Sequence, residues 1–401
     1  QYLNGSDKMK SIIVKDGIYW VGVKNPELRV FDIIVNTKKG TTYNSYLIDD
    51  EKVAVIDSVK EGYSDEHLQK IKDVIGQRKV DYIIVNHTEL DHSGCIKDLL
   101  KQYPDAVIYA SKAACLYLKK IINGPFNAHP ITDGEVLSIG KRTLKFISAP
   151  FLHWPDTIFT YDENDGILFP CDAFGCHFCG KGIFDYDAGD FSGEVKYYFD
   201  SIMYPFKKYV VQAVDKIKDL DIKMICPSHG PIHTRDPYRY LKLYRDWSID
   251  ALTKNDTKSA AIFYVSAYGN TEYMAKMMKE RIERSGFNVY MFDISTENMD
   301  IMIKTINSSD IVLVGSPTIN QDAVRPVWEL LSLVSPIENR GKVAGAFGSY
   351  GWSGEAAKMI SDRLRSLKFR VVEPPVTVNF VPSEDEKKKI IEFTDKILSK
   401  F

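Results

Sequence analysis

Cysteine and long apolar runs are both scarce in this sequence. Six cysteines in 401 residues are too few to staple a secreted fold with disulfides, so they predict a reducing compartment. No stretch approaches the roughly 20 apolar residues that span a bilayer, and the N-terminus lacks the basic region and apolar run of a signal peptide. These absences predict a cytoplasmic protein without a membrane partner.

An excess of charge of one sign is equally absent. The chain carries 52 basic and 54 acidic residues, for a formal net charge of −2, with no long run of either sign. This balance gives no electrostatic case for nucleic acid and favours a small-molecule or protein redox partner. A length of 401 residues exceeds what one core usually organises, which predicts two domains. Residues 1–8 precede Met9 and are left out of the fold prediction.

The first part of the chain alternates β-branched runs with turn residues, a pattern typical of short strands. Helical periodicity appears further along, with one helix interrupted by a proline. A strand-rich sheet layered with helices is therefore expected. The predicted strands are Phe31–Val35, Tyr43–Asp49, Val53–Asp57 and Tyr82–Val85, and the predicted helices are Lys112–Ile122, Tyr198–Leu220 with a break at Pro205, and Tyr238–Leu252.

A short polar stretch, Thr253–Lys258, follows the last of these helices and predicts domains at residues 9–252 and 259–401. Beyond it, apolar strands alternate with helices, which predicts a doubly wound, five-stranded parallel sheet. The predicted strands are Ala260–Val265, Val289–Asp293, Ile311–Gly315, Val343–Phe347 and Val376–Phe380, and the helices are Thr271–Ser285, Met299–Ile306, Ala323–Leu333, Glu355–Leu367 and Glu384–Leu398.

Potential metal ligands cluster directly after the apolar strand that ends at Val85. Spacing of two residues can turn side chains of an extended loop toward one point. Three further candidate ligands each follow an apolar, strand-like run elsewhere in the chain. Together they form a mixed histidine and carboxylate set, which suits dinuclear non-haem iron better than zinc. The candidate ligands are His87, Glu89, Asp91, His92, His153, Asp172 and His229.

A pair of metals needs a shared ligand, and Asp172 is the expected bridge. His92 directly follows Asp91, so its ligation is left open. His177 is a candidate proton source, or else a buried hydrogen-bonded histidine. Tyr198, with Tyr197, is a candidate phenol near the metals, or else a core aromatic. Two other histidines, His67 and His129, are expected at the surface. Cys176 and Cys179 form a CxxC motif, for which three interpretations stay open: a redox pair, half of a zinc site, or small buried residues.

The second domain carries three loops, each after the carboxyl end of a predicted strand. The first presents hydroxyls, backbone N–H groups and a helix N-terminus, which suit a phosphate. The other two are rich in small residues and carry aromatics, which suit a flat ring. The candidate cofactor-binding residues are Ser266, Ala267, Tyr268, Gly269, Asn270, Thr271, Pro317, Thr318, Ile319, Asn320, Ser349, Tyr350, Gly351 and Trp352.

The ligand pattern from Lys10 to Leu252 resembles the metallo-β-lactamase fold, an αββα sandwich, but has HxExDH where zinc hydrolases carry HxHxDH. The three loops resemble those of flavodoxins. Together the two halves resemble the flavodiiron proteins, also called A-type flavoproteins. That resemblance implies two iron ions on the seven ligands, FMN in the three loops, and an oxidoreductase that reduces O2 to water or NO to N2O.

The resemblance also implies a head-to-tail homodimer, or a homotetramer, in which the FMN of one chain faces the iron site of another. No rubredoxin-like CxxC pair follows the flavodoxin-like part, so an external donor is expected, either rubredoxin or the deazaflavin F420. Two alternatives stay open: a zinc hydrolase of the metallo-β-lactamase fold with an accessory flavodoxin module, and an electron carrier or gas sensor with a vestigial metal half.

Overall fold

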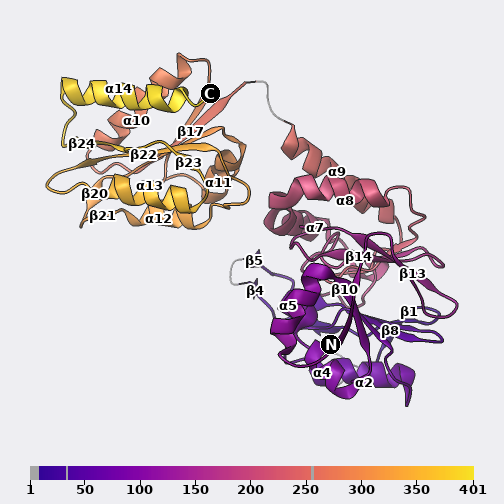
Figure 1. The fold of residues 1–401 in the computed structure, drawn as a ribbon. Coiled ribbons are helices and arrows are strands. Elements are labelled where there is room, and N and C mark those ends of the chain that lie inside the picture. The colour runs from indigo at the N-terminus through magenta and orange to yellow at the C-terminus, as the bar shows by residue number, and fades with distance from the viewer. Residues whose placement is uncertain (1–8, 33–34, 254–256) are drawn as a thin grey trace. The chain divides into compact units, whose positions relative to one another are not determined.

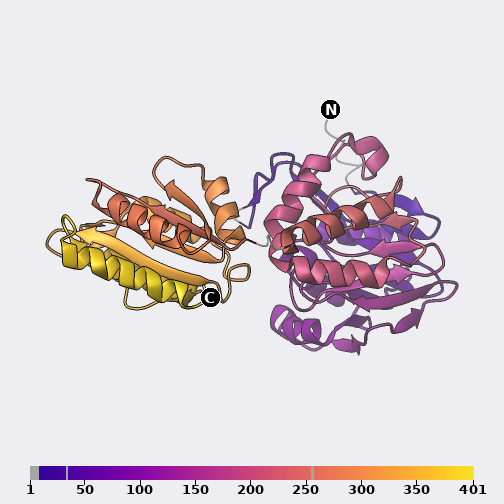
Figure 2. The ribbon, with the colours of Figure 1, turned by 90° about the horizontal axis from the view of Figure 1, so that it is seen from above.

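The computed structural model describes residues 9–32, 35–253 and 257–401. The chain divides into two compact units, Gln1–Thr253 and Lys254–Phe401 (Figures 1 and 2). Residues 1–8, which the fold prediction leaves out, lie outside the described part. Among the described residues, no helix combines the length and the apolar character needed to cross a membrane.

Two sheets form the centre of the first unit. The larger has the order β1-β2-β7-β8-β9-β10-β11, and the smaller the order β12-β13-β14-β15-β16. The strands of the larger sheet are β1 (Ile12–Lys15), β2 (Ile18–Trp20), β7 (Tyr46–Asp49), β8 (Val53–Ile56), β9 (Tyr82–Val85), β10 (Val107–Ser111) and β11 (Asn127–Ile131). Those of the smaller are β12 (Val136–Ser138), β13 (Thr143–Ser148), β14 (Ile158–Asp162), β15 (Ile167–Phe169) and β16 (Met224–Ile225).

Apolar side chains hold these two sheets face to face. Ile56 and Ile84 of the larger sheet share one buried cluster with Phe146 and Phe169 of the smaller. The strands β8 and β9 are apolar at nearly every position because helices cover their other face. The covering helices are α2 (Ser64–Ile75), α4 (Ile96–Gln102) and α5 (Lys112–Ile122) on the larger sheet, and α7 (Ser192–Tyr198), α8 (Lys207–Ile217) and α9 (Pro237–Leu252) on the smaller (Figure 1). The predicted αββα sandwich is confirmed.

Two predicted strands of this unit are wrong in detail. The range Phe31–Val35 is not one strand, since β4 (Val30–Phe31) pairs antiparallel with β5 (Val35–Asn36), and residues 33–34 lie outside the described part. The range Tyr43–Asp49 divides into β6 (Thr41–Tyr43) and β7. The division falls at Asn44, whose amide donates to the carbonyl oxygens of Pro227 and Gly230 at 2.8 and 2.9 Å. Asn44 therefore lies between the two strands, and its side chain holds a loop that is distant in the sequence.

The predicted helix Tyr198–Leu220 begins earlier and is interrupted where expected. After α7 the chain makes a π-helical turn over Phe199–Met203 and a 3-10 turn over Tyr204–Phe206, and α8 follows. Pro205 cannot donate a backbone hydrogen bond, which accounts for the break.

The surface position predicted for His67 is wrong. This residue is buried, and its Nδ1 lies 2.9 Å from the Val21 carbonyl oxygen. Burial lowers the pKa of His67 to about 4.

The second unit is a parallel sheet with the order β18-β17-β19-β22, in which both β23 and β24 pair with β22. Its strands are β17 (Ser259–Tyr264), β18 (Asn288–Asp293), β19 (Ile311–Gly315), β22 (Val343–Tyr350), β23 (Arg370–Val371) and β24 (Val376–Asn379). The predicted doubly wound topology is confirmed, but six strands replace five. Pro374 and Pro375 lack backbone N–H groups, so the edge is divided into two short strands.

Helices cover both faces of this sheet. Apolar residues of α10 (Asn270–Glu283) and α14 (Glu384–Leu398) pack on one face. Those of α11 (Met299–Ser308), α12 (Arg325–Ser332) and α13 (Ala356–Ser366) pack on the other. A small hairpin, β20 (Thr318–Ile319) with β21 (Asp322–Ala323), follows β19. Because the strands are parallel, the loops after β17, β19 and β22 all leave from the same edge of the sheet.

Candidate functional site

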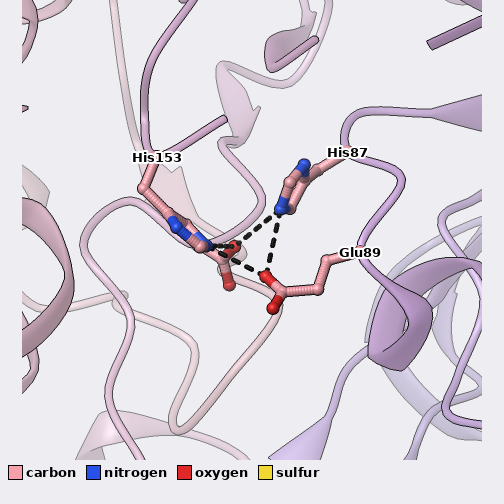
Figure 3. Close-up of side chains that lie close together, drawn as sticks. His87, Glu89 and His153 are labelled. Carbon is pink, nitrogen blue, oxygen red and sulfur yellow. Dashed lines mark hydrogen bonds and ion pairs between the residues drawn. The ribbon is translucent and has the colours of Figure 1, made fainter. Parts of the chain in front are cut away.

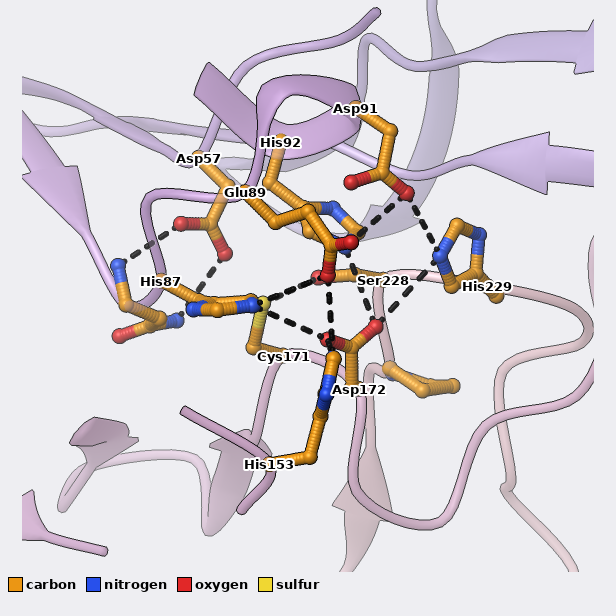
Figure 4. A network of polar contacts seen from close by, with 12 residues as sticks. Asp57, His87, Glu89, Asp91, His92, His153, Cys171, Asp172, Ser228 and His229 are labelled. Carbon is orange, nitrogen blue, oxygen red and sulfur yellow. Dashed lines mark hydrogen bonds and ion pairs between the residues drawn. The ribbon is translucent and has the colours of Figure 1, made fainter. Parts of the chain in front are cut away.

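The structure brings all seven predicted metal ligands together at the seam between the two sheets of the first unit (Figure 4). His87 and Glu89 follow β9, and the short helix α3 (Leu90–Ser93) carries the next two ligands. His153 comes from the loop between β13 and β14, Asp172 follows β15, and His229 follows β16. Strands of both sheets therefore end at one point.

Buried Asn86 fixes this meeting of strand ends. Its side-chain amide donates to the Phe169 carbonyl oxygen at 3.2 Å, and its amide oxygen accepts a hydrogen bond from Thr160 Oγ1 at 2.7 Å. Its backbone N–H donates to Asp57 at 2.7 Å. Asn86 thus joins the end of β9 to β14 and β15 directly beside the ligands.

One group of ligands gathers around Oδ2 of Asp172. His153 Nε2 lies 3.0 Å from Glu89 Oε2 and 3.5 Å from Asp172 Oδ2. His87 Nε2 lies 3.3 Å from the same glutamate oxygen and 3.7 Å from Asp172 Oδ2 (Figure 3). Two imidazole nitrogens and two carboxylate oxygens therefore face one small space.

A second group gathers around the other oxygen of the same carboxylate. His92 Nε2 lies 3.1 Å from Asp172 Oδ1 and 3.3 Å from Asp91 Oδ2. His229 Nε2 lies 3.4 Å from Asp172 Oδ1 and 3.0 Å from Asp91 Oδ2. Asp172 is thus common to both groups, and His92, whose role the sequence left open, points its Nε2 into the second one.

The chemistry of this cluster fits two cations. Both carboxylate oxygens of Asp91 and Oδ2 of Asp172 are buried with no hydrogen-bond donor among the described residues. Burial opposes charge on the imidazoles, but the surrounding carboxylates raise the pKa of His87 and His153 to about 10 and that of His92 to about 9. The cluster therefore requires positive charge, which metal ions supply without protons.

Residues around the cluster set the tautomers of its histidines. Asp156 Oδ1 lies 3.2 Å from His87 Nδ1, and Asp156 also accepts hydrogen bonds from the backbone N–H and hydroxyl of Thr88 at 2.8 and 2.7 Å. His229 Nδ1 donates to the Thr42 carbonyl oxygen at 2.6 Å. With Nδ1 as the donor, each ring keeps the Nε2 lone pair for the cluster.

Sequence reasoning missed two carboxylates at this site. Asp156 carries no local signal, because its role depends on a histidine 69 positions away. Asp32 lies at the partly exposed edge of the cluster, where burial and the neighbouring Glu89 carboxylate raise the pKa of Asp32 to about 6. Neither belongs to a motif that spacing alone would reveal.

The predicted flavin loops lie together at the carboxyl edge of the second unit. Gly269 has φ of 85° and precedes α10, and Ser266 Oγ accepts a hydrogen bond from the backbone N–H of Glu272 at 3.2 Å. The hydroxyls of Thr271 and Ser349 are 2.8 Å apart, which links the first loop to the third. The remaining predicted positions in these loops are Ala267, Tyr268 and Asn270, then Pro317, Thr318, Ile319 and Asn320, then Tyr350, Gly351 and Trp352.

These loops fit a flat ring and a phosphate. A Cβ on Gly348 would collide with the Ser316 carbonyl oxygen, so the backbones of two loops approach closely only without a side chain there. Trp352 and Tyr268 expose 79% and 94% of their surface. Both rings are therefore accessible to a flat partner at this edge of the sheet.

Comparisons with known proteins match both units. Residues 41–230 match the ODP family beta lactamase, and residues 262–393 match flavodoxin. The flavo-diiron protein FprA2 of Clostridium acetobutylicum is 43% identical over 96% of this chain and 98% of its own. A nitric oxide reductase of Moorella thermoacetica is 37% identical over 97% and 98%. The structure of rubredoxin oxygen:oxidoreductase from Desulfovibrio gigas superposes with a TM-score of 0.70 at 28% identity, covering 98% of each chain.

This chain belongs to the flavo-diiron proteins. The family consists of oxidoreductases, as the names of these relatives state. The resemblance drawn from HxExDH and the three loops is therefore confirmed, and so is the fold class of both halves.

Two further predicted residues of this flavo-diiron protein lie against the cluster. The hydroxyl of buried Tyr198 donates to Asp172 Oδ1 at 2.9 Å. His177 Nδ1 lies 3.0 Å from Thr41 Oγ1, its Nε2 has no hydrogen-bond partner among the described residues, and burial lowers the pKa of His177 well below its usual range. Tyr197, by contrast, is exposed, and its hydroxyl accepts the backbone N–H of Asn36 at 3.3 Å.

The cysteines make no disulfide, since all six are free thiols. Cys176 is buried and Cys179 partly buried, and neither belongs to a metal-ligand group among the described residues. Cys171 lies closer to the cluster, in a group with His92 and Asp172, and its Sγ accepts a hydrogen bond from Ser228 Oγ at 3.3 Å. The CxxC thus gains no support as half of a zinc site.

Asp156 provides a test of the cluster as a metal site. We expect Asp156→Asn to weaken metal affinity by roughly 10–100-fold, because the amide no longer holds His87 in the ligating tautomer. Competition with a fluorescent chelator measures this affinity, and Asp221→Asn, a change of the same size at an exposed position, serves as the control. Equal affinities of the two variants would contradict the role given to Asp156.

Proposed function

We propose that this chain reduces O2 to water and NO to N2O at a pair of iron ions held by the seven-residue cluster, with electrons delivered through FMN bound in the three loops of the second unit. One observation carries the proposal. Asp172 offers one oxygen to each of two ligand groups, and each group adds two histidines and a carboxylate. Such a shared, oxygen-rich set suits paired iron.

When bound, an iron pair would supply a position for a diatomic molecule and two electrons, and FMN would supply two more. Reduction of one O2 to two waters consumes four electrons and four protons. Reduction of two NO molecules to N2O and one water consumes two electrons and two protons. The residues of the chain hold this arrangement: Asp172 fixes the separation of the two positions, and Tyr198 orients Asp172 through its hydrogen bond. His177 Nε2, for which the described part of the chain offers no hydrogen-bond partner, is placed to pass protons.

For FMN, we propose that residues 266–271 hold the phosphate through hydroxyls, backbone N–H groups and the N-terminus of α10. The loops at 317–320 and 349–352 would hold the ring, with Trp352 or Tyr350 stacked on it. Electrons come from an external donor. The name of the Desulfovibrio gigas neighbour supports rubredoxin in this role. The six free thiols support a reducing, cytoplasmic setting.

Turnover of reconstituted protein tests the function. We expect protein loaded with iron and FMN, and reduced anaerobically through rubredoxin, to consume both O2 and NO, with N2O measured by gas chromatography. Zinc-loaded protein with the same FMN content is the control, because zinc has no redox chemistry. Cleavage of thioesters or phosphoesters by the zinc form, with no gas consumption by the iron form, would establish the rival hydrolase instead.

We further propose a head-to-tail homodimer in which the FMN of one chain serves the iron pair of the other. The test combines Asp172→Ala, which removes the shared ligand, with Gly269→Val, which disfavours the left-handed backbone of the phosphate loop. Each variant alone should be inactive. Co-expression should restore roughly a quarter of the wild-type rate, since random pairing yields heterodimers with one complete site. Dimers that recover no activity would place electron transfer within one chain.

A further inference from the structure

A cavity of about 190 Å³ opens in the first unit beside α7, and we call it the α7 cavity. His177 and Tyr198 line it together with Gly193, Glu194 and Lys39. The liquid volume of a water molecule is about 30 Å³, so the cavity has room for several molecules of the size of O2 or NO.

The inner wall of the α7 cavity is also part of the wall of the metal-ligand cluster. Tyr198 lines the cavity and donates its hydroxyl to Asp172 Oδ1 at 2.9 Å. The ring of His177, also at the cavity, lies 4.9 Å from the ring of His229 and 5.0 Å from that of Tyr198. These two side chains therefore touch the cavity on one side and the ligands on the other.

Polar contacts join the segments that form the outer rim of the cavity. Lys39 Nζ lies 2.7 Å from Glu194 Oε1, and the backbone N–H of Cys179 donates to the Lys39 carbonyl oxygen at 2.9 Å. Asn36 also lines the cavity, and its backbone N–H donates to the Tyr197 hydroxyl at 3.3 Å. The space is thus built by contacts between two distant segments and does not depend on one loop.

The other accessible edge of the cluster has a different character. His153 and Glu89 expose 16% and 14% of their side chains, so the first ligand group reaches the surface directly.

We infer that the α7 cavity is the route by which the diatomic substrate reaches the metal-ligand cluster from solvent, passing between His177 and Tyr198. This inference rests on the proposed function, because it assigns a path to the substrate of that reaction.

Gly193 offers a way to close the cavity without touching the ligands. It lies in the first turn of α7, lines the cavity, and a Cβ placed on it meets no atom within 4 Å. Larger side chains therefore enter open space. Alanine should leave the cavity open and is also a better helix former than glycine, so Gly193→Ala is the matched control for Gly193→Leu and Gly193→Trp.

The experiment measures steady-state kinetics of the iron- and FMN-loaded variants, together with xenon binding in pressurised crystals. We expect xenon in the α7 cavity of the wild type and of Gly193→Ala, and its exclusion by the larger side chains. For the excluding variants kcat/KM for O2 should fall at least about tenfold with kcat at saturation unchanged, the pattern of impaired access. Stopped-flow absorbance should show equally slowed NO binding to the reduced protein.

Two results would overturn the inference: absence of xenon from the wild-type cavity, or wild-type kcat/KM in a variant that excludes xenon. The second result would assign access to the edge at His153. Gly193→Leu keeps the test valid if the tryptophan variant does not fold, as judged by iron and FMN content. Failure of the proposed function is distinguishable, because it would appear as absent iron-dependent turnover in the wild type itself.

Discussion

The rest of the first unit depends on the contacts of one buried carboxylate, that of Asp172. Four imidazole nitrogens lie within 3.1–3.7 Å of its two oxygens, and the Tyr198 hydroxyl donates to one of them. An unpaired carboxylate at this depth would cost several kcal/mol or would take up a proton. The surrounding imidazoles stabilise it, so the arrangement that keeps the fold intact also presents two adjacent groups of candidate metal ligands.

The position of this carboxylate depends on the alignment of two sheets. Asp172 follows a strand of the smaller sheet, whereas His87 follows a strand of the larger. Asn86 and Asn44 hold the two sheets in register at this point, through hydrogen bonds from the larger sheet to the loops and strands of the smaller. A shift of one sheet against the other would separate the ligand groups, so the buried amides at the seam serve the metal site as well as the fold.

Sequence alone predicted the second unit closely and the first less well. Strands such as Ile311–Gly315 and helices such as Glu384–Leu398 match because each is long enough to display its own period. The two-residue strands β4 and β5 are too short to do so. His67 lies in a polar helical stretch, and only the packing of that helix against Val21 makes it a buried residue. Tertiary packing decided these cases, and no local pattern records it.

The candidate site shows the same division. The seven candidate ligands could be selected from the sequence because they lie in segments that follow apolar strands, and strand ends meet at sheet edges. Asp156 could not, since a carboxylate that orients a histidine needs only proximity in space. The sharing of Asp172 by two groups was predicted from the need for a bridge, and the distances in the structure support it.

The electron paramagnetic resonance spectrum of iron-loaded protein, poised with one electron per pair of irons, tests the central claim most directly. If one carboxylate is shared by both ions, the protein should bind two irons per chain and give a single signal from two coupled ions. A spectrum in which isolated ferric ions account for all the iron would contradict a pair that shares Asp172. Binding of only one iron per chain would contradict it as well.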